Sequence, residues 1–146
     1  MASNSLNTII CCGGIFLAKS TKRFLFLQRT HIKTAGTWGF VGGKKEPTDT
    51  TSLETLNREI SEEIGECPSI KKIVPLELFT STDQNFQYNT YVLITENEFI
   101  PVLNNEHCGY AWVNFDQWPK PLHNGVKNSL NSKTVKAKLE ILLEVI

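Results

Sequence analysis

The sequence has no excess of charge of either sign. Lysine and arginine together number 15, aspartate and glutamate also number 15, and the formal net charge is zero. A protein that coats DNA or RNA must neutralise many phosphates with basic side chains. The balance therefore argues against bulk nucleic-acid binding, although a local basic cleft is compatible with it.

The chain also lacks a long apolar run and a paired cysteine motif. The stretch Ile9–Ala18 is shorter than the roughly 20 residues that a membrane-spanning helix needs, and no basic segment typical of a signal peptide precedes it. The four cysteines are Cys11, Cys12, Cys67 and Cys108, and they form no C-x-x-C pattern. We therefore expect no membrane attachment, no zinc site or redox pair, reduced thiols and a cytoplasmic location.

The length of 146 residues fits one domain of mixed secondary structure. The apolar runs Thr8–Leu17 and Arg23–Gln28, with a polar segment between them, are typical of a β-hairpin. Further strands are predicted at Lys72–Phe79, Tyr88–Ile94 and Gly109–Phe115, and a closing helix at Thr134–Ile146. Many strands with two principal helices predict a sheet covered by helices on both faces.

The other principal helix is predicted between Thr51 and Gly65. Thr51 and Glu54 can form a capping box at its start, and glycine is typical just after a helix end. The apolar stripe of this helix is made of Leu53, Leu56, Ile60 and Ile64. Its glutamates lie away from the stripe, so the helix can dock on a sheet while its carboxylates face a cleft.

Three carboxylates share one face of this helix, because Glu59, Glu62 and Glu63 stand at positions i, i+3 and i+4. Like charges one turn apart weaken an isolated helix by a few tenths of a kcal/mol. A hard divalent cation offsets this repulsion, since Mg²⁺ and Mn²⁺ prefer oxygen ligands. The cluster predicts metal-dependent chemistry on a phosphate compound. Taken alone, it would also fit a solvent-facing charged surface.

Together with its neighbours, the cluster resembles the signature of the Nudix hydrolase family, G-x5-E-x7-R-E-U-x-E-E-x-G-U, where U is a bulky aliphatic residue. The matching residues are Gly43, Arg58, Glu59, Ile60, Glu62, Glu63 and Gly65. The preceding segment Trp38–Gly43 looks like the family's W-x-F-P-G-G approach. The resemblance implies a Nudix α/β/α sandwich, a mixed β-sheet flanked by helices, as a single domain over residues 1–146.

The chain departs from this signature at three points. Asp49 stands where the first glutamate is expected, one extra residue separates it from Arg58, and Glu66 occupies the final aliphatic position. In the family that first acidic residue mainly braces the arginine. Asp49 could still do so, or Glu46 or Glu54 could substitute.

The resemblance implies a metal-dependent hydrolase that uses Mg²⁺ or Mn²⁺. It would cleave the pyrophosphate linkage of a nucleoside triphosphate, ADP-ribose, a sugar nucleotide or a dinucleoside polyphosphate. The implied metal ligands are Glu59, Glu62, Glu63 and the carbonyl oxygen of Gly43. Arg58 would orient these carboxylates through ion pairs. The general base is either a glutamate of the helix or Glu106, which precedes a predicted strand.

Substrate contacts are expected outside the signature. The candidates are Arg29, Lys44 and Phe86, with His31 and Lys33 as further phosphate-binding groups. Phe86 is favoured among the aromatic residues because it lies in a polar connection, whereas most of the others are expected in the core. The three histidines, His31, His107 and His123, are expected at the surface or as loop anchors. The segment Pro119–Leu130 is either a lid or an ordinary connection.

Two other functions stay open. A catalytically silent Nudix-fold module could bind or sense a nucleotide, although such proteins usually lose a helix carboxylate and this chain keeps all three. An RNA 5′-cap hydrolase would need an RNA path, against which the balanced charge counts. The sequence does not select a substrate class, although the polar segment Thr80–Gln87 is slightly similar to sugar-nucleotide-acting members. A homodimer is compatible with an edge rich in strand and aromatic residues.

Overall fold

The structure is a computed structural model and describes residues 8–146. The strands are β1 (Ile9–Ala18), β2 (Arg23–Arg29), β3 (Trp38–Gly39), β4 (Val41–Lys44), β5 (Ile70–Thr80), β6 (Phe86–Thr95) and β7 (His107–Val113). The helices are α1 (Ser52–Ile64), α2 (Asn124–Asn131) and α3 (Lys133–Val145). None of these helices is long and apolar enough to cross a membrane.

The strands form one mixed sheet in the order β3-β2-β1-β6-β5, with β4 paired to β1 and β7 paired to β2. Strand β1 runs parallel to β6 along its whole length, and the other pairs are antiparallel. On its second edge, β1 pairs with β2 at Leu17 and Ala18 and with β4 from Cys11 to Gly14. Because β2 and β4 share this edge of β1, Gly42 and Gly43 of β4 lie on the sheet next to α1.

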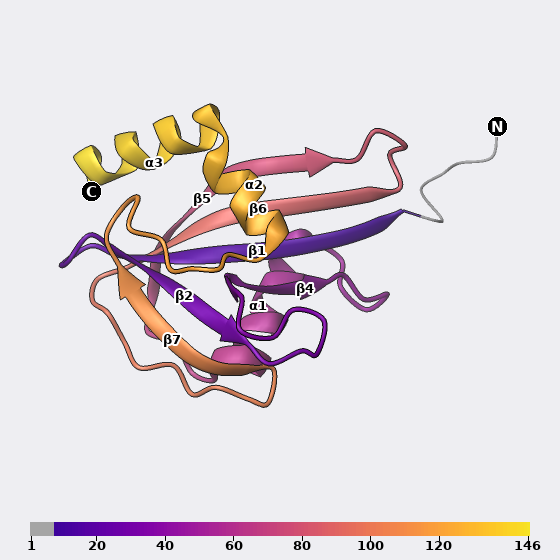
Figure 1. The fold of residues 1–146 in the computed structure, drawn as a ribbon, viewed down its shortest axis with the longest axis horizontal. Helices are drawn as coiled ribbons and strands as arrows, with labels where there is room; N and C mark the ends of the chain where they lie inside the picture. Colours follow the sequence, from indigo (N-terminus) through magenta and orange to yellow (C-terminus); the bar gives the residue numbers. More distant parts are fainter. Residues whose placement is uncertain (1–7) are drawn as a thin grey trace.

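Helices cover both faces of the sheet, as predicted. Figure 1 shows α2 and α3 on one side, with α1 behind the sheet on the other. Alternate residues of β1 follow this division: Ile15 and Leu17 pack in the core below α2 and α3, whereas Cys12 and Phe16 pack with α1. The period of two in a strand produces this pattern, because successive side chains point to opposite faces.

Most predicted elements are confirmed, with shifts of one or two residues at their ends. The expectation of two principal helices was wrong, because part of the segment Pro119–Leu130 forms α2. Val126 and Leu130 lie one turn apart on α2 and are both buried. The segment is also tied to β3, where the Trp38 N–H donates to the Pro121 carbonyl at 2.9 Å. It is therefore a packed connection in this structure.

The start of α1 forms only half of the predicted capping box. The Glu54 N–H donates to Thr51 Oγ1 at 3.1 Å, but the Glu54 carboxylate accepts from Thr50 instead of Thr51. Gly65 ends the helix with φ of +70°, a conformation that favours glycine. The predicted apolar stripe was wrong at Leu53, the second residue of α1, which is 42% exposed and is absent from the core that Leu56, Ile60 and Ile64 form with the sheet.

Candidate active site

Asp49 braces the signature arginine. Arg58 donates from Nη2 and Nε to the Asp49 carboxylate at 2.9 and 3.3 Å. Asp49 also accepts from the Glu46 N–H at 2.9 Å and from Thr55 Oγ1 at 3.0 Å. The hydrogen bonds from Arg58, followed by the Glu46 amide, hold the pKa of Asp49 well below its usual range. The shorter acid therefore makes the contact despite the longer loop.

Arg58 also directs the neighbouring carboxylates. Its Nη1 donates to Glu59 at 2.9 Å and to Glu62 at 3.2 Å, and its Nη2 donates to the Lys44 carbonyl at 3.0 Å. The Glu62 side chain is 49% exposed, whereas that of Glu59 is 12% exposed. The expectation that Arg58 orients these groups thus agrees with its contacts, and Glu62 lies on the solvent side of the arginine.

Glu63 lies inside the protein, and the expectation that all three glutamates lie off the packed face was wrong for it. Its carboxyl group contacts that of Glu59 and accepts from the Gly42 N–H at 3.3 Å. Burial raises the pKa of Glu63 to about 10, followed by the hydrogen bond that its protonated carboxyl donates to Glu59 and by the charge of Glu59. The Glu59 carboxylate lies close over Gly43, because a Cβ at this position would come within 2.6 Å of Glu59 Oε1.

The residues present fit a magnesium or manganese ion, although they do not form a complete cage. Within residues 8–146, no three histidine, cysteine, aspartate or glutamate side chains are gathered as a metal-binding group. Two carboxylates, Glu59 and Glu63, are held together against the backbone of Gly42 and Gly43. Mg²⁺ usually takes only one or two carboxylates and keeps several waters, so this donor set suits it.

A cavity of about 270 Å³ opens beside Glu63. Its lining residues are Arg29, Thr30, His31, Gly42, Glu63, Asn105, Glu106 and His107. The fold thereby brings Glu106, the predicted distant base, into the same space as the buried helix carboxylate. Arg29, from the end of β2, supplies a cationic side chain to this space.

Three of the predicted substrate contacts, Lys33, Lys44 and Phe86, lie outside this lining, and Lys33 is exposed. Lys44 is exposed at the end of β4. Phe86 is partly buried between two other aromatic rings, with centroid distances of 6.2 Å to Phe79 and 6.3 Å to Tyr88. The Tyr88 hydroxyl occupies the space above Gly13, where a Cβ would collide with it.

The loop that carries Glu106 is anchored to the end of α1. Asn104 Nδ2 donates to the Glu62 carbonyl at 2.7 Å and to Glu106 Oε2 at 3.2 Å. The Val102 N–H donates to the Ile64 carbonyl at 3.0 Å. Sequence reasoning missed Asn104, because a loop asparagine gives no local signal of a partner so distant along the chain.

The three histidines differ in environment. His31 is exposed, and its Nδ1 accepts from the Lys33 N–H at 3.3 Å. His123 caps α2 and accepts from the Gly125 N–H at 3.3 Å. His107 is only 7% exposed, so the expected surface position was wrong for it, and as the first residue of β7 it directly follows the loop that carries Glu106. Burial, together with the charge of Arg29, lowers the pKa of His107.

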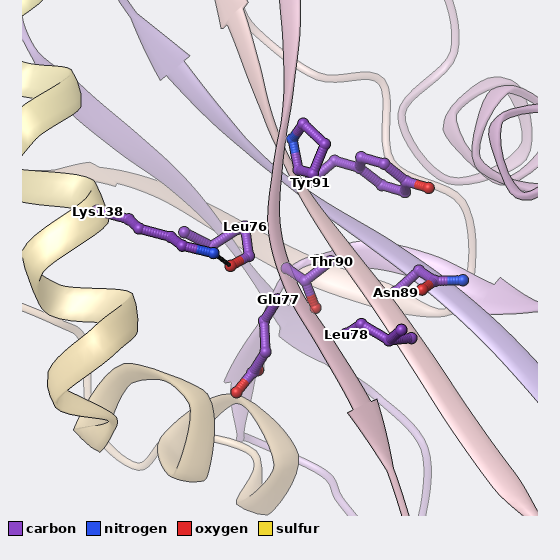
Figure 2. A pocket seen from close by; sticks show the side chains of 8 residues that line it. Leu76, Glu77, Leu78, Asn89, Thr90, Tyr91 and Lys138 are labelled. Atoms are coloured by element: carbon purple, nitrogen blue, oxygen red, sulfur yellow. Dashed lines mark hydrogen bonds between the residues drawn. The ribbon is translucent and has the colours of Figure 1, made fainter.

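A second cavity of about 270 Å³ lies at the β5 edge of the sheet, below α3. Figure 2 shows Lys138 reaching from α3 to the Leu76 carbonyl, at 2.9 Å. Glu77 accepts from Ser129 Oγ at 2.5 Å, and Asn89 Nδ2 donates to Ser52 Oγ at 3.0 Å. Because these polar groups already have protein partners, the cavity beside Glu63 is the better candidate for chemistry.

Replacing Asp49 with asparagine is expected to destabilise the protein at neutral pH and much less in acid. The folded-state pKa of Asp49 is lowered, so its contribution is fully present above the ordinary aspartate pKa of about 3.9 and is lost as the pH falls below it. Urea unfolding of both proteins from pH 7 to pH 2.5 measures this difference. A gap between wild type and Asp49→Asn that stays constant over this range would contradict the assignment.

The comparisons with known proteins agree with this geometry. The family model of the NUDIX domain matches residues 12–132, and the chain belongs to this family. A MutT NUDIX hydrolase from Burkholderia pseudomallei superposes with a TM-score of 0.68 at 22% identity, covering 85% of this chain and 96% of that one. The comparison with curated proteins gave no significant match.

Two further solved structures share the fold at lower identity. The NUDIX domain of Shewanella oneidensis NrtR, crystallised with ADP ribose, has a TM-score of 0.66 at 15% identity and covers 92% of this chain and 88% of its own. An Ap4A hydrolase from C. elegans has a TM-score of 0.62 at 16% identity, and the match covers 93% of this chain and 99% of that one. At these identities the likeness shows the fold alone.

Proposed function

We propose that this protein is a Mg²⁺- or Mn²⁺-dependent hydrolase that cleaves the pyrophosphate linkage of a nucleoside diphosphate derivative. The observation that carries the proposal is the cavity that Glu63 shares with Glu106 and Arg29. The cavity is lined by Glu63, whose buried carboxyl contacts that of Glu59, and by Glu106, an exposed carboxylate on an anchored loop. Binding a cation and accepting a proton from water are separate tasks. In this proposal Glu59 and Glu63 would bind the cation, and Glu106 would accept the proton.

Each residue has a distinct task in this proposal. Glu59 and Glu63 would hold the divalent cation, with the Gly43 carbonyl as a further ligand, and Glu62 would join once it leaves Arg58. The cation supplies positive charge that stabilises the phosphate oxygens as the phosphorus is attacked. Arg29 would bind the phosphate that faces the cavity.

The bond changes follow from hydrolysis. The oxygen of a water molecule forms a bond to phosphorus, and the bond from phosphorus to the bridging oxygen breaks. Glu106 would take the proton from the attacking water, and the bridging oxygen leaves on the other phosphate. An exposed carboxylate with an amide donor on one oxygen keeps its second oxygen free to accept this proton.

A substrate panel tests the proposal. Wild-type protein is incubated with Mg²⁺, with Mn²⁺ or with EDTA, and the substrates are nucleoside triphosphates, ADP-ribose, sugar nucleotides, dinucleoside polyphosphates and capped RNA. We expect turnover of one class, which EDTA abolishes and added metal restores. Products separated by chromatography identify the bond that is cleaved.

The same panel separates the enzyme from a silent binding module. ADP-ribose is a useful first ligand, because a neighbour of the same fold was crystallised with it. Nucleotide binding by calorimetry without turnover of any class would overturn the hydrolase and favour a sensor. Turnover of capped RNA alone would favour the cap hydrolase.

A further inference from the structure

His107 holds an unpaired polar atom beside the candidate metal site. It is the first residue of β7 and pairs with Arg29 where the register between β2 and β7 shifts. Within residues 8–146, only two buried side-chain nitrogen or oxygen atoms have no hydrogen-bond partner, His107 Nδ1 and Trp118 Nε1. The nearest acidic group to His107 Nδ1 is Glu63, whose Oε1 lies 3.8 Å away.

An unpaired buried polar group destabilises a protein, and such groups are rare in folded proteins. The separation of 3.8 Å is longer than a hydrogen bond but is closed by a shift of less than about 1 Å. The two oxygens of Glu63 face different donors. Oε2 accepts from the Gly42 N–H at 3.3 Å, while Oε1 faces the imidazole.

We propose that His107 is a positioning residue for Glu63: its Nδ1–H donates to Oε1 when Glu63 binds the divalent cation, and so fixes the orientation of this carboxylate. The inference rests on the proposed metal-dependent function. It assigns the imidazole a role through Glu63, because Mg²⁺ and Mn²⁺ prefer oxygen ligands. Groups that orient a metal ligand typically change metal affinity by about 10- to 100-fold when removed.

Two substitutions separate hydrogen bonding from shape. His107→Asn keeps an N–H donor close to the position of Nδ1, whereas His107→Leu fills similar space without a donor. Trp118→Phe is the matched control, since it removes the other unpaired buried N–H, which lies in the core below α2 and α3. Circular dichroism verifies folding, and His107→Phe replaces His107→Leu if that variant does not fold.

The readout is binding of Mn²⁺ alone, from the electron paramagnetic resonance signal of the free ion. We expect His107→Leu to weaken Mn²⁺ binding by about 10- to 100-fold and His107→Asn to stay within about threefold of wild type, with Trp118→Phe unchanged. Equal weakening in His107→Asn and His107→Leu would overturn the inference, as would wild-type affinity in His107→Leu or no Mn²⁺ binding by wild type.

Nucleotide turnover by wild type, measured separately, decides the proposed function. Expected Mn²⁺ affinities without any turnover would leave the positioning role of His107 standing and overturn the hydrolase. Turnover by wild type, together with wild-type Mn²⁺ affinity in His107→Leu, would support the hydrolase and overturn the positioning role of His107.

Discussion

Replacing Glu63 with glutamine is expected to lower kcat/KM at least about a hundredfold. Glutamine has nearly the same shape, and its amide oxygen can still accept from the Gly42 N–H. The change removes the negative charge that Glu63, which lies against Glu59, would carry when it binds the cation. A cation held by the two residues would lose one of its anionic ligands.

The same substitution should leave the metal-free protein no less stable. A buried carboxyl with a pKa raised to about 10 is mostly protonated at neutral pH, and glutamine mimics that neutral form. Thermal unfolding in EDTA is therefore expected to show an equal or higher Tm for Glu63→Gln. A lower kcat/KM together with an equal or higher Tm distinguishes loss of metal binding from loss of folding.

Glu66→Gln is the matched control. It is the same chemical change three residues further along the chain, at an exposed position just beyond the end of α1. Its kcat/KM should stay within about threefold of wild type, because surface changes away from the site have small effects. An activity of Glu63→Gln close to wild type would contradict the assignment of Glu63, as would an equal loss in both variants.

The second large effect is expected on stability, from Leu56→Ala. Leu56 is 1% exposed and packs with Cys12, Phe16 and Leu93 in the core between α1 and the sheet. Removing a buried leucine side chain leaves a cavity and destabilises a protein by about 2–5 kcal/mol. Urea unfolding followed by circular dichroism measures this change.

Leu53→Ala provides the comparison on the same helix. Leu53 is 42% exposed, and the same truncation there should lower the free energy of unfolding by less than about 1 kcal/mol. Similar losses in the two variants would show that the sheet-facing stripe of α1 is placed wrongly. The pair is informative because the sequence pattern assigned both leucines to that stripe.

Local pattern was enough to predict most of the fold. The alternation within β1 and β2 and the helical spacing in α1 and α3 depend on residues that are close in the chain, and these elements are confirmed. The prediction was wrong at Leu53, because periodicity shows which side of a helix is apolar but not how far the contact with a sheet extends. It also left open the helical part of the segment Pro119–Leu130, whose helix is short and starts with a histidine cap.

The candidate site also has a part that local spacing predicts and a part that only the packing of distant segments decides. Arg58, Glu59, Glu62 and Glu63 lie within two turns of one helix, so their shared position follows from spacing. The bracing acid could be narrowed to Asp49, Glu46 or Glu54 from the sequence. Only the packed loop selects Asp49 as the acid that Arg58 contacts through two nitrogens.

By itself, the sequence determined an α/β domain of the NUDIX family with a carboxylate helix that starts and ends near Thr51 and Gly65. Only the tertiary structure decided that Glu63 is buried, that Glu106 shares its cavity, and that His107 faces it with an unpaired nitrogen. The physical reason is that helix and strand periods are set by neighbouring residues. Burial and pKa depend on which distant segments pack together, and here β4, β7 and the loop before β7 converge on the end of α1.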